Sequence, residues 1–199
     1  MTNHIKGLNK SNIEERIIWV DDDIDDNSLE YSKWIIEWNR QDNLHPDEVR
    51  KPIRLLFFCY GGNLDVNNVL IDTISLSTTP IIGVNIGEAL SAGCFIFLAC
   101  HERYTFPKAQ FLIHRGSGMF EGTYDIIMSQ IIQYQQEMEK LEEYILKRTK
   151  IPKKLFEKNF ANEWYLSADE AIKYGIASRK IENLDEIFDD ENYNKADSE

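Results

Sequence analysis

The stretch "NIGEALSAGCFIFLAC" covers residues 85–100 and contains a single serine, Ser91, among small and apolar residues. It overlaps the apolar run "PIIGVNIG" at 80–87, which is typical of a strand buried on both faces, and the residues after Ser91 are typical of a buried helix. A serine between a strand and a helix is a favourable helix N-cap. However, the glycines and alanines around it leave the backbone uncrowded, and a helix N-terminus favours an oxyanion. Ser91 is therefore either a capping residue or a nucleophile.

The same alternation of apolar strands and helical stripes continues through much of the chain. Strands are expected at 16–20, 53–60, 80–87, 103–107 and 109–114, with helices at 28–41, 64–77 and 91–100. Strands that alternate with helices predict an α/β fold, built from repeated βαβ units that form a parallel sheet covered by helices.

One long amphipathic helix is expected at 124–150, ended by Pro152. It would be roughly 40 Å long, which is more than a domain of this size needs for its own core. We therefore expect the helix to project and to pack on a partner. The remaining organisation is a polar N-terminal segment at 1–15, a single domain at 16–188, and an acidic, disordered tail at 189–199.

Composition excludes several classes of function. The formal net charge of −12 argues against a nucleic-acid partner, because phosphate binding needs a basic surface. The polar N-terminus lacks the apolar region of a secretory signal, and no apolar run is long enough for a membrane span. The three cysteines lie in or beside apolar runs, as reduced cysteines of a cytoplasmic protein do. No metal or cofactor is expected, since neither the cysteine spacing nor the acidic run at 21–26 fits a metal site.

A nucleophilic serine needs a base, and His114 is the best placed of the four histidines. It ends the strand at 109–114, directly before the glycine-rich "RGSG". In a parallel sheet, sites gather beyond the carboxyl ends of the strands, where Ser91 also lies. A purely structural role at the strand end is the alternative for His114.

An acid is then needed to orient the imidazole. The downstream candidates are Glu157, Glu163, Asp169 and Glu170. "SADEA" at 167–171 fits a capping box, which gives Glu170 a structural role and leaves Asp169 beside the helix N-terminus. Glu163, in the short connection before that helix, stays a possible choice.

The turn "YGGN" at 60–63 also falls at the carboxyl edge of the sheet. Its two glycines allow a backbone N–H to face a ligand closely, although an ordinary tight turn explains them equally well. Beside Ser91, this turn would supply the second donor of an oxyanion hole.

Together these residues resemble the ClpP family, the proteolytic subunits of the Clp protease. The family's Gly-Gly turn, its Gly-x-Ala-x-Ser-x-Gly segment and its strand-end "MIH" are similar to "YGG", "GEALSAG" and "FLIH" here. A later family pattern of Asp, three residues, then Ser-Ala-x-Glu-Ala-x-x-Tyr-Gly is similar to "EWYLSADEAIKYG". The similarity runs from about Arg16 to Ile181, and the four motifs occur in the family's order.

The resemblance implies a crotonase-type, ClpP-like fold and a serine endopeptidase that cleaves peptides or unfolded proteins inside an oligomeric chamber. Ser91 would be the nucleophile and His114 the general base, with the backbone amides of Gly62 and Ala92 as the oxyanion hole. The helix at 124–150 would be the handle that interlocks heptameric rings into a tetradecamer, and an AAA+ unfoldase is the implied partner.

Three departures from the family pattern motivate an alternative. The acid is Glu163 where the family has Asp, Tyr60 stands where the family commonly has proline, and Arg115 follows His114 where the family usually has Gln. The Arg115 charge next to the base would disfavour protonation of His114. The alternative is a catalytically weak or inactive assembly or regulatory subunit. An acyl-CoA-handling enzyme of the crotonase fold is a third class, which would not require both Ser91 and His114.

Overall fold

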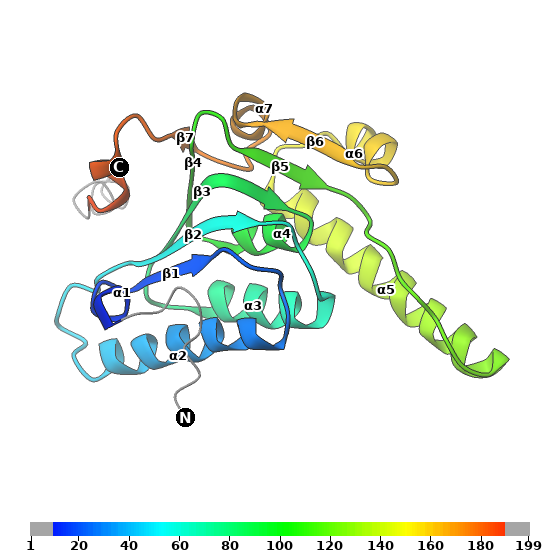
Figure 1. Cartoon of the computed structure of the whole chain (residues 1–199), viewed down its shortest axis with the longest axis horizontal. Coiled ribbons are helices and arrows are strands. Elements are labelled where there is room, and N and C mark those ends of the chain that lie inside the picture. Colours follow the sequence, from blue (N-terminus) through cyan, green and yellow to red (C-terminus); the bar gives the residue numbers. More distant parts are fainter. Residues whose placement is uncertain (1–9, 190–199) are drawn as a thin grey trace.

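The computed structural model describes residues 10–189 as an α/β fold with one seven-stranded sheet (Figure 1). The strands are β1 (Ile17–Val20), β2 (Ile53–Cys59), β3 (Ile81–Leu90), β4 (Glu102–Thr105), β5 (Gln110–Ile113), β6 (Trp164–Ser167) and β7 (Arg179–Lys180). The α-helices are α1 (Lys10–Glu14), α2 (Leu29–Asn43), α3 (Leu64–Leu76), α4 (Ala92–Ala99), α5 (Tyr124–Arg148), α6 (Lys153–Asn159) and α7 (Ala168–Lys173). Two short 3-10 helices, η1 (Asp26–Ser28) and η2 (Leu184–Ile187), complete the order.

The long strand β3 organises the sheet by pairing with two different neighbours on one side. Its first half pairs with β4 and its last residues pair with β5, both in parallel, while β2 runs along its other edge. The predicted parallel βαβ arrangement is thereby confirmed for β1 to β5. The sequence did not indicate β6, which was expected to be a connection and instead pairs antiparallel with β5.

The core lies between the sheet and the helices α2, α3 and α4 (Figure 1). All eight residues of α4 are buried, which explains why its sequence is apolar on every side. Phe97 of α4 packs against Phe57 of β2 edge to face and against Phe111 of β5, with ring centroids 5.4 and 5.3 Å apart. These aromatic contacts join α4 to two strands of the sheet.

A smaller apolar cluster lies on the other face of the sheet, where alternate strand residues point. Leu56, Ile82 and Tyr104 belong to it, and Ile187 of η2 covers them. The acidic tail expected at 189–199 lies outside the described residues apart from Asp189, as do the first nine residues of the polar segment expected at 1–15.

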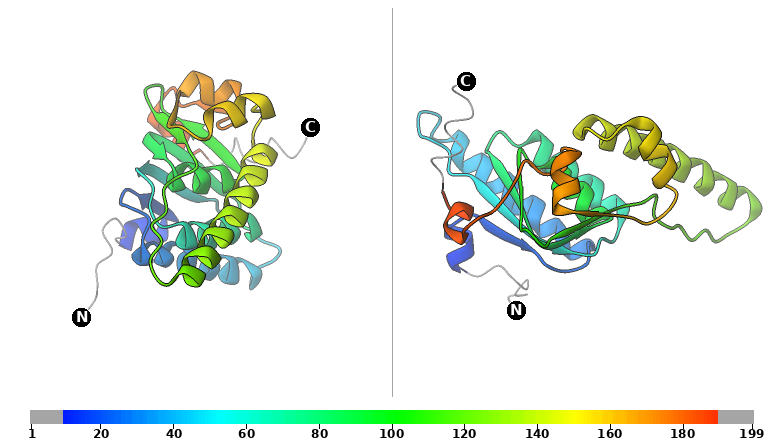
Figure 2. Two further views of the ribbon diagram at one scale, coloured as in Figure 1. Left: turned by 90° about the vertical axis from the view of Figure 1, so that its right-hand side faces the viewer. Right: turned by 90° about the horizontal axis from the view of Figure 1, so that it is seen from above.

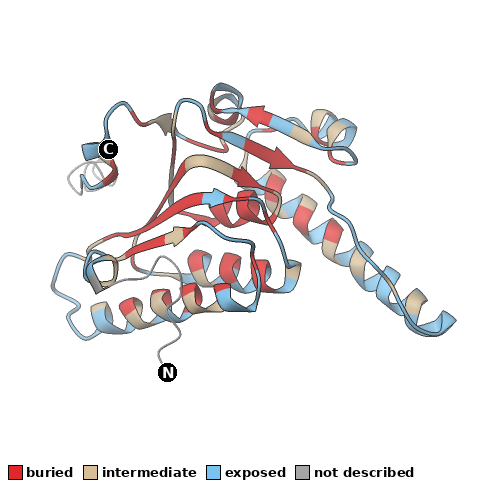
Figure 3. Ribbon diagram, viewed as in Figure 1, coloured by how far each residue is buried: buried red, intermediate tan, exposed pale blue. Residues whose placement is uncertain are grey.

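Helix α5 extends away from this body (Figure 2). Its buried residues are Met138, Leu141 and Ile145, all in its second half. The first half is exposed (Figure 3), and it carries large apolar side chains at Tyr124, Ile126, Met128, Ile131 and Ile132. The body of the protein therefore holds only the C-terminal half of this helix.

Two side chains of α5 fix its C-terminal half to α4. The Arg148 guanidinium donates hydrogen bonds to the carbonyls of Leu98 and Cys100, both at 2.7 Å, where α4 ends. The Tyr144 hydroxyl donates to the Phe95 carbonyl at 2.9 Å. A cation at the C-terminus of a helix satisfies its free carbonyls and its dipole, so these bonds stabilise the junction.

Candidate active site

Ser91 lies in a tight turn between β3 and α4. Its φ of +51° is in a region that residues other than glycine rarely adopt, and such strain is concentrated at functional sites. The sequence suggested that its hydroxyl caps α4, but the side chain makes no capping hydrogen bond. The capping interpretation of this side chain is therefore wrong.

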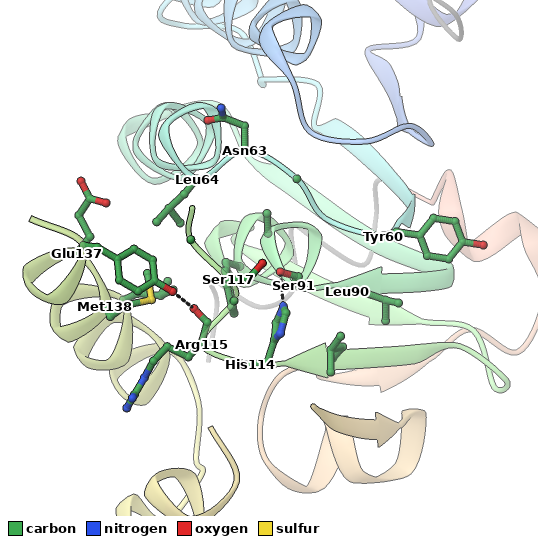
Figure 4. A pocket seen from close by; sticks show the side chains of 18 of the residues that line it. Tyr60, Asn63, Leu64, Leu90, Ser91, His114, Arg115, Ser117, Glu137 and Met138 are labelled. Atoms are coloured by element: carbon green, nitrogen blue, oxygen red, sulfur yellow. Dashed lines mark hydrogen bonds between the residues drawn. The ribbon is translucent and has the colours of Figure 1, made fainter. Parts of the chain in front are cut away.

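The Ser91 hydroxyl instead meets His114, whose Nε2 lies 2.7 Å from the Ser91 Oγ (Figure 4). The register of the sheet explains the contact. Leu90 at the end of β3 pairs with Leu112 of β5, and the Ser91 amide donates to the Leu112 carbonyl at 3.0 Å. Ser91 and His114, which directly follow β3 and β5, therefore lie at the same edge of the sheet.

Burial lowers the pKa of His114 below its usual value, and the negative charge of Glu163 partly opposes this effect. The imidazole is therefore neutral at neutral pH, which is the form that accepts a proton. The sequence suggested that Arg115 would disfavour protonation, but its charge is not among the causes of the shift. Its guanidinium lies over the Phe160 ring, 5.6 Å from the ring centroid, and points away from the imidazole (Figure 4).

The ladder between β5 and β6 places Glu163 near His114. Ile113 pairs with Trp164, so the residues just outside this pair, His114 and Glu163, are level with each other. Glu163 is exposed, and no hydrogen bond joins it to His114 within residues 10–189. Glu163 therefore acts on the imidazole through its charge in this structure.

The other three candidate acids have partners away from His114. Glu170 forms the predicted capping box with Ser167, whose amide donates to the Glu170 carboxylate at 2.9 Å. Asp169 forms an ion pair with Lys180 at 2.6 Å. Glu157, on α6, lies 3.8 Å from Lys153. Of the four carboxylates, Glu163 is the one whose charge acts on His114.

The glycine turn packs directly against the serine turn. A Cβ on Gly61 would lie 2.8 Å from the Ser91 Cβ and 3.3 Å from the Ala92 nitrogen, so only glycine allows this approach. Gly62 and Ala92 line the same cavity as Ser91 and His114. Ala92 is the first residue of α4, and its N–H has no partner within the helix. Both residues thus border the cavity that contains the Ser91 hydroxyl.

The sequence did not indicate the wall that α5 adds to this cavity of about 750 Å³. Tyr134, Glu137, Met138 and Leu141 line it from that helix. Tyr134 also donates a hydrogen bond to the Arg115 carbonyl at 3.1 Å, which joins α5 to the segment after His114. The helical stripe contains Tyr134, Met138 and Leu141, but their position beside Ser91 depends on packing between distant elements.

The described residues contain no helix that is both long and apolar enough to cross a membrane. They also contain no group of three or more histidine, cysteine or acidic side chains arranged to hold a metal ion.

Comparisons with known proteins agree on one family. The sequence profile of the Clp protease family matches residues 3–183. An ATP-dependent Clp protease proteolytic subunit from Paracoccus denitrificans is 27% identical over 139 residues, which cover 69% of this chain and 70% of that protein. The proteolytic subunit 2 from Pseudomonas aeruginosa is 26% identical over 141 residues, covering 68% of this chain and 69% of that protein.

The fold agrees with a solved structure of the same family. A mutant of ClpP1 from Listeria monocytogenes superimposes with a TM-score of 0.71 at 22% sequence identity, over 89% of this chain and 98% of that chain. The predicted crotonase-type, ClpP-like fold is confirmed. From the profile match over nearly its whole length, we conclude that this chain belongs to the Clp protease family.

Proposed function

We propose that this protein is a serine endopeptidase that cleaves peptides or unfolded polypeptides. The observation that carries the proposal is the contact of 2.7 Å between the Ser91 Oγ and the His114 Nε2, at a strained turn beside a cavity. A hydroxyl that donates to a neutral imidazole is the arrangement of an activated serine nucleophile.

In the first half of the reaction, Ser91 Oγ attacks the peptide carbonyl while His114 Nε2 accepts its proton. The tetrahedral oxyanion is stabilised by the Gly62 and Ala92 amides. When the C–N bond breaks, His114 gives the proton to the leaving amine, and an acyl ester remains on Ser91. A water molecule then repeats the sequence, with His114 as its base, and releases the acid and the free serine.

We assign Glu163 the third role. In the tautomer that a base requires, the His114 Nε2 accepts from Ser91 and the Nδ1 carries the proton. A carboxylate near that ring stabilises the imidazolium that forms during catalysis, and the Glu163 charge already raises the pKa of His114 against the effect of burial.

We further propose that the protein works as a homo-oligomer of heptameric rings, arranged as a tetradecamer in the cytoplasm and fed by an AAA+ unfoldase. The exposed apolar side chains along the first half of α5 support an assembly contact. The relatives are named as proteolytic subunits of an ATP-dependent protease, which supports an ATPase partner. The three buried cysteines are all unpaired, as is usual for cytoplasmic proteins.

A fluorophosphonate probe tests the enzymatic assignment. The wild-type protein should be labelled at Ser91, and both Ser91→Ala and His114→Ala should abolish labelling while the far-UV circular dichroism stays unchanged. Absence of labelling in folded, oligomeric wild-type protein would favour the inactive assembly subunit instead. Light scattering measures the mass of the assembly in the same samples, and a stable monomer would contradict the ring.

A further inference from the structure

One wall of the cavity beside Ser91 is apolar. Leu64 at the start of α3, Phe95 of α4, and Met138 and Leu141 of α5 line it. Phe95, Met138 and Leu141 are at least 94% buried, so they expose only a narrow surface toward the cavity. A narrow apolar wall of this kind suits the methylene stem of a long, unbranched side chain, which gains dispersion contacts along its length.

The charge of the cavity is unbalanced. Its lining contains three carboxylates, Glu137, Asp65 and Glu163, and one cation, Arg115. The Arg115 guanidinium is held over the Phe160 ring, so it does not neutralise the carboxylates of the opposite wall. The chain as a whole carries a net charge of −12, which adds to a negative potential at the site.

Glu137 lies at the end of the apolar wall, next to Met138 on α5 and across the cavity from Ser91 (Figure 4). It is half-buried, and its partner is a neutral one: the Gln133 side chain donates to its carboxylate at 3.1 Å. Within residues 10–189, no lysine or arginine lies at ion-pair distance from Glu137. A carboxylate with a single neutral partner retains free acceptor capacity.

We propose that this pocket binds a lysine or arginine side chain of the substrate, on the residue whose carbonyl Ser91 attacks, and that Glu137 determines this preference. The methylene stem lies along Phe95, Met138 and Leu141, while the cationic head reaches the Glu137 carboxylate. An apolar side chain of equal length fills the same space but leaves the carboxylate desolvated and without a cation, which is unfavourable. The inference rests on the proposed peptidase function, because it identifies the substrate residue from its position beside Ser91.

The test uses two fluorescent peptides that differ at one residue, lysine or norleucine, which share the unbranched stem and differ in the charged head. Their affinities for the Ser91→Ala protein are measured by anisotropy, which requires no turnover. Hydrolysis of both peptides by the wild-type protein is measured in parallel as kcat/KM.

We expect the lysine peptide to bind about tenfold more tightly, the discrimination given by one charge-assisted hydrogen bond. Adding Glu137→Gln to Ser91→Ala should reduce the ratio of affinities to about one, and 1 M NaCl should reduce it as well. Glu139→Gln is the matched control. Glu139 lies on the same helix and accepts from Gln135 at 3.0 Å, as Glu137 does from Gln133, but it does not line the cavity.

Equal affinities of the two peptides for Ser91→Ala would overturn the assignment of the pocket, as would an equal loss of preference in Glu139→Gln. Wild-type hydrolysis without any preference for lysine would refute the pocket and leave the peptidase function intact. Preferential binding of lysine without hydrolysis would support the pocket and refute the peptidase function.

Discussion

The packing of Gly61 against Ser91 gives a prediction with a matched control. Gly61 has a φ of +117°, and an added Cβ would lie 2.8 Å from the Ser91 Cβ and 3.1 Å from the Leu90 carbonyl oxygen. Gly116 has a φ of +79°, and an added Cβ there would meet nothing within 4 Å. The two positions therefore share an unfavourable backbone conformation for alanine, and they differ in the space around the new methyl group.

The expected magnitudes follow from these contacts. A positive φ costs a residue with a side chain about 1–2 kcal/mol, which is the whole effect expected for Gly116→Ala. Gly61→Ala adds overpacking of about 1–3 kcal/mol, because the backbone of the serine turn must move. Its free energy of unfolding should therefore fall by about 2–5 kcal/mol, and the moved Ser91 should react with a fluorophosphonate at least about tenfold more slowly than in the wild type.

Urea unfolding of both variants at one protein concentration measures the stability difference, because oligomers unfold in a concentration-dependent way. The labelling rate of Gly61→Ala is measured under conditions in which it is fully folded. Equal destabilisation of the two variants, together with wild-type labelling of Gly61→Ala, would refute the contact between the two turns.

Three further predictions concern His114, the core and an ion pair. Glu163→Gln removes the charge that raises the pKa of His114, so the acidic limb of kcat/KM should move to lower pH; an unmoved limb would show that the carboxylate does not act on the imidazole. Phe97→Ala should lower the free energy of unfolding by about 3–5 kcal/mol, since the ring is fully buried, and a loss below about 1 kcal/mol in urea unfolding would contradict the aromatic packing. Burial acts to raise the pKa of Asp42, but hydrogen bonds, including those from Arg16, outweigh burial and lower it. The ionised Asp42 carboxylate therefore stabilises the folded protein above about pH 4, and this stabilisation is lost as the pH falls further. Arg16→Ala should therefore flatten the loss of stability between pH 5 and pH 3, and an unchanged slope would exclude the pair as its cause.

The parts of the fold set by local sequence were predictable. Apolar runs and helical stripes gave the alternation of strands and helices, and the rule for carboxyl ends of parallel strands placed Ser91 and His114 on one edge. The strand β6 was not predictable, because "WYLS" is short and its role depends on the antiparallel partner β5. The positive φ of Ser91 could not be predicted either, because the sequence pattern of a serine before a helix is the same whether or not the serine caps it.

The position of Glu137 beside the cavity likewise depends on contacts between distant elements. The stripe along α5 indicated that Tyr134, Met138 and Leu141 share a face. It did not indicate that this face is opposite Ser91, because the positions of α4 and α5 depend on contacts such as those of Tyr144 and Arg148. Local sequence patterns thus predicted the strands and helices, whereas the cavity beside Ser91 forms only when distant elements pack together.

Because Arg148 fixes the C-terminal end of α5 to α4, a movement of the exposed tip is a rotation of the helix about this anchor. At the rise of an α-helix, Met138 lies about 15 Å and Tyr124 about 36 Å along the helix axis from Arg148. A rigid rotation that displaces the tip by about 1 Å thus moves the cavity wall by about 0.4 Å. A displacement of the exposed tip therefore reaches the wall of the cavity beside Ser91 reduced by more than about twofold, and the burial of Met138 and Leu141 opposes what remains of it.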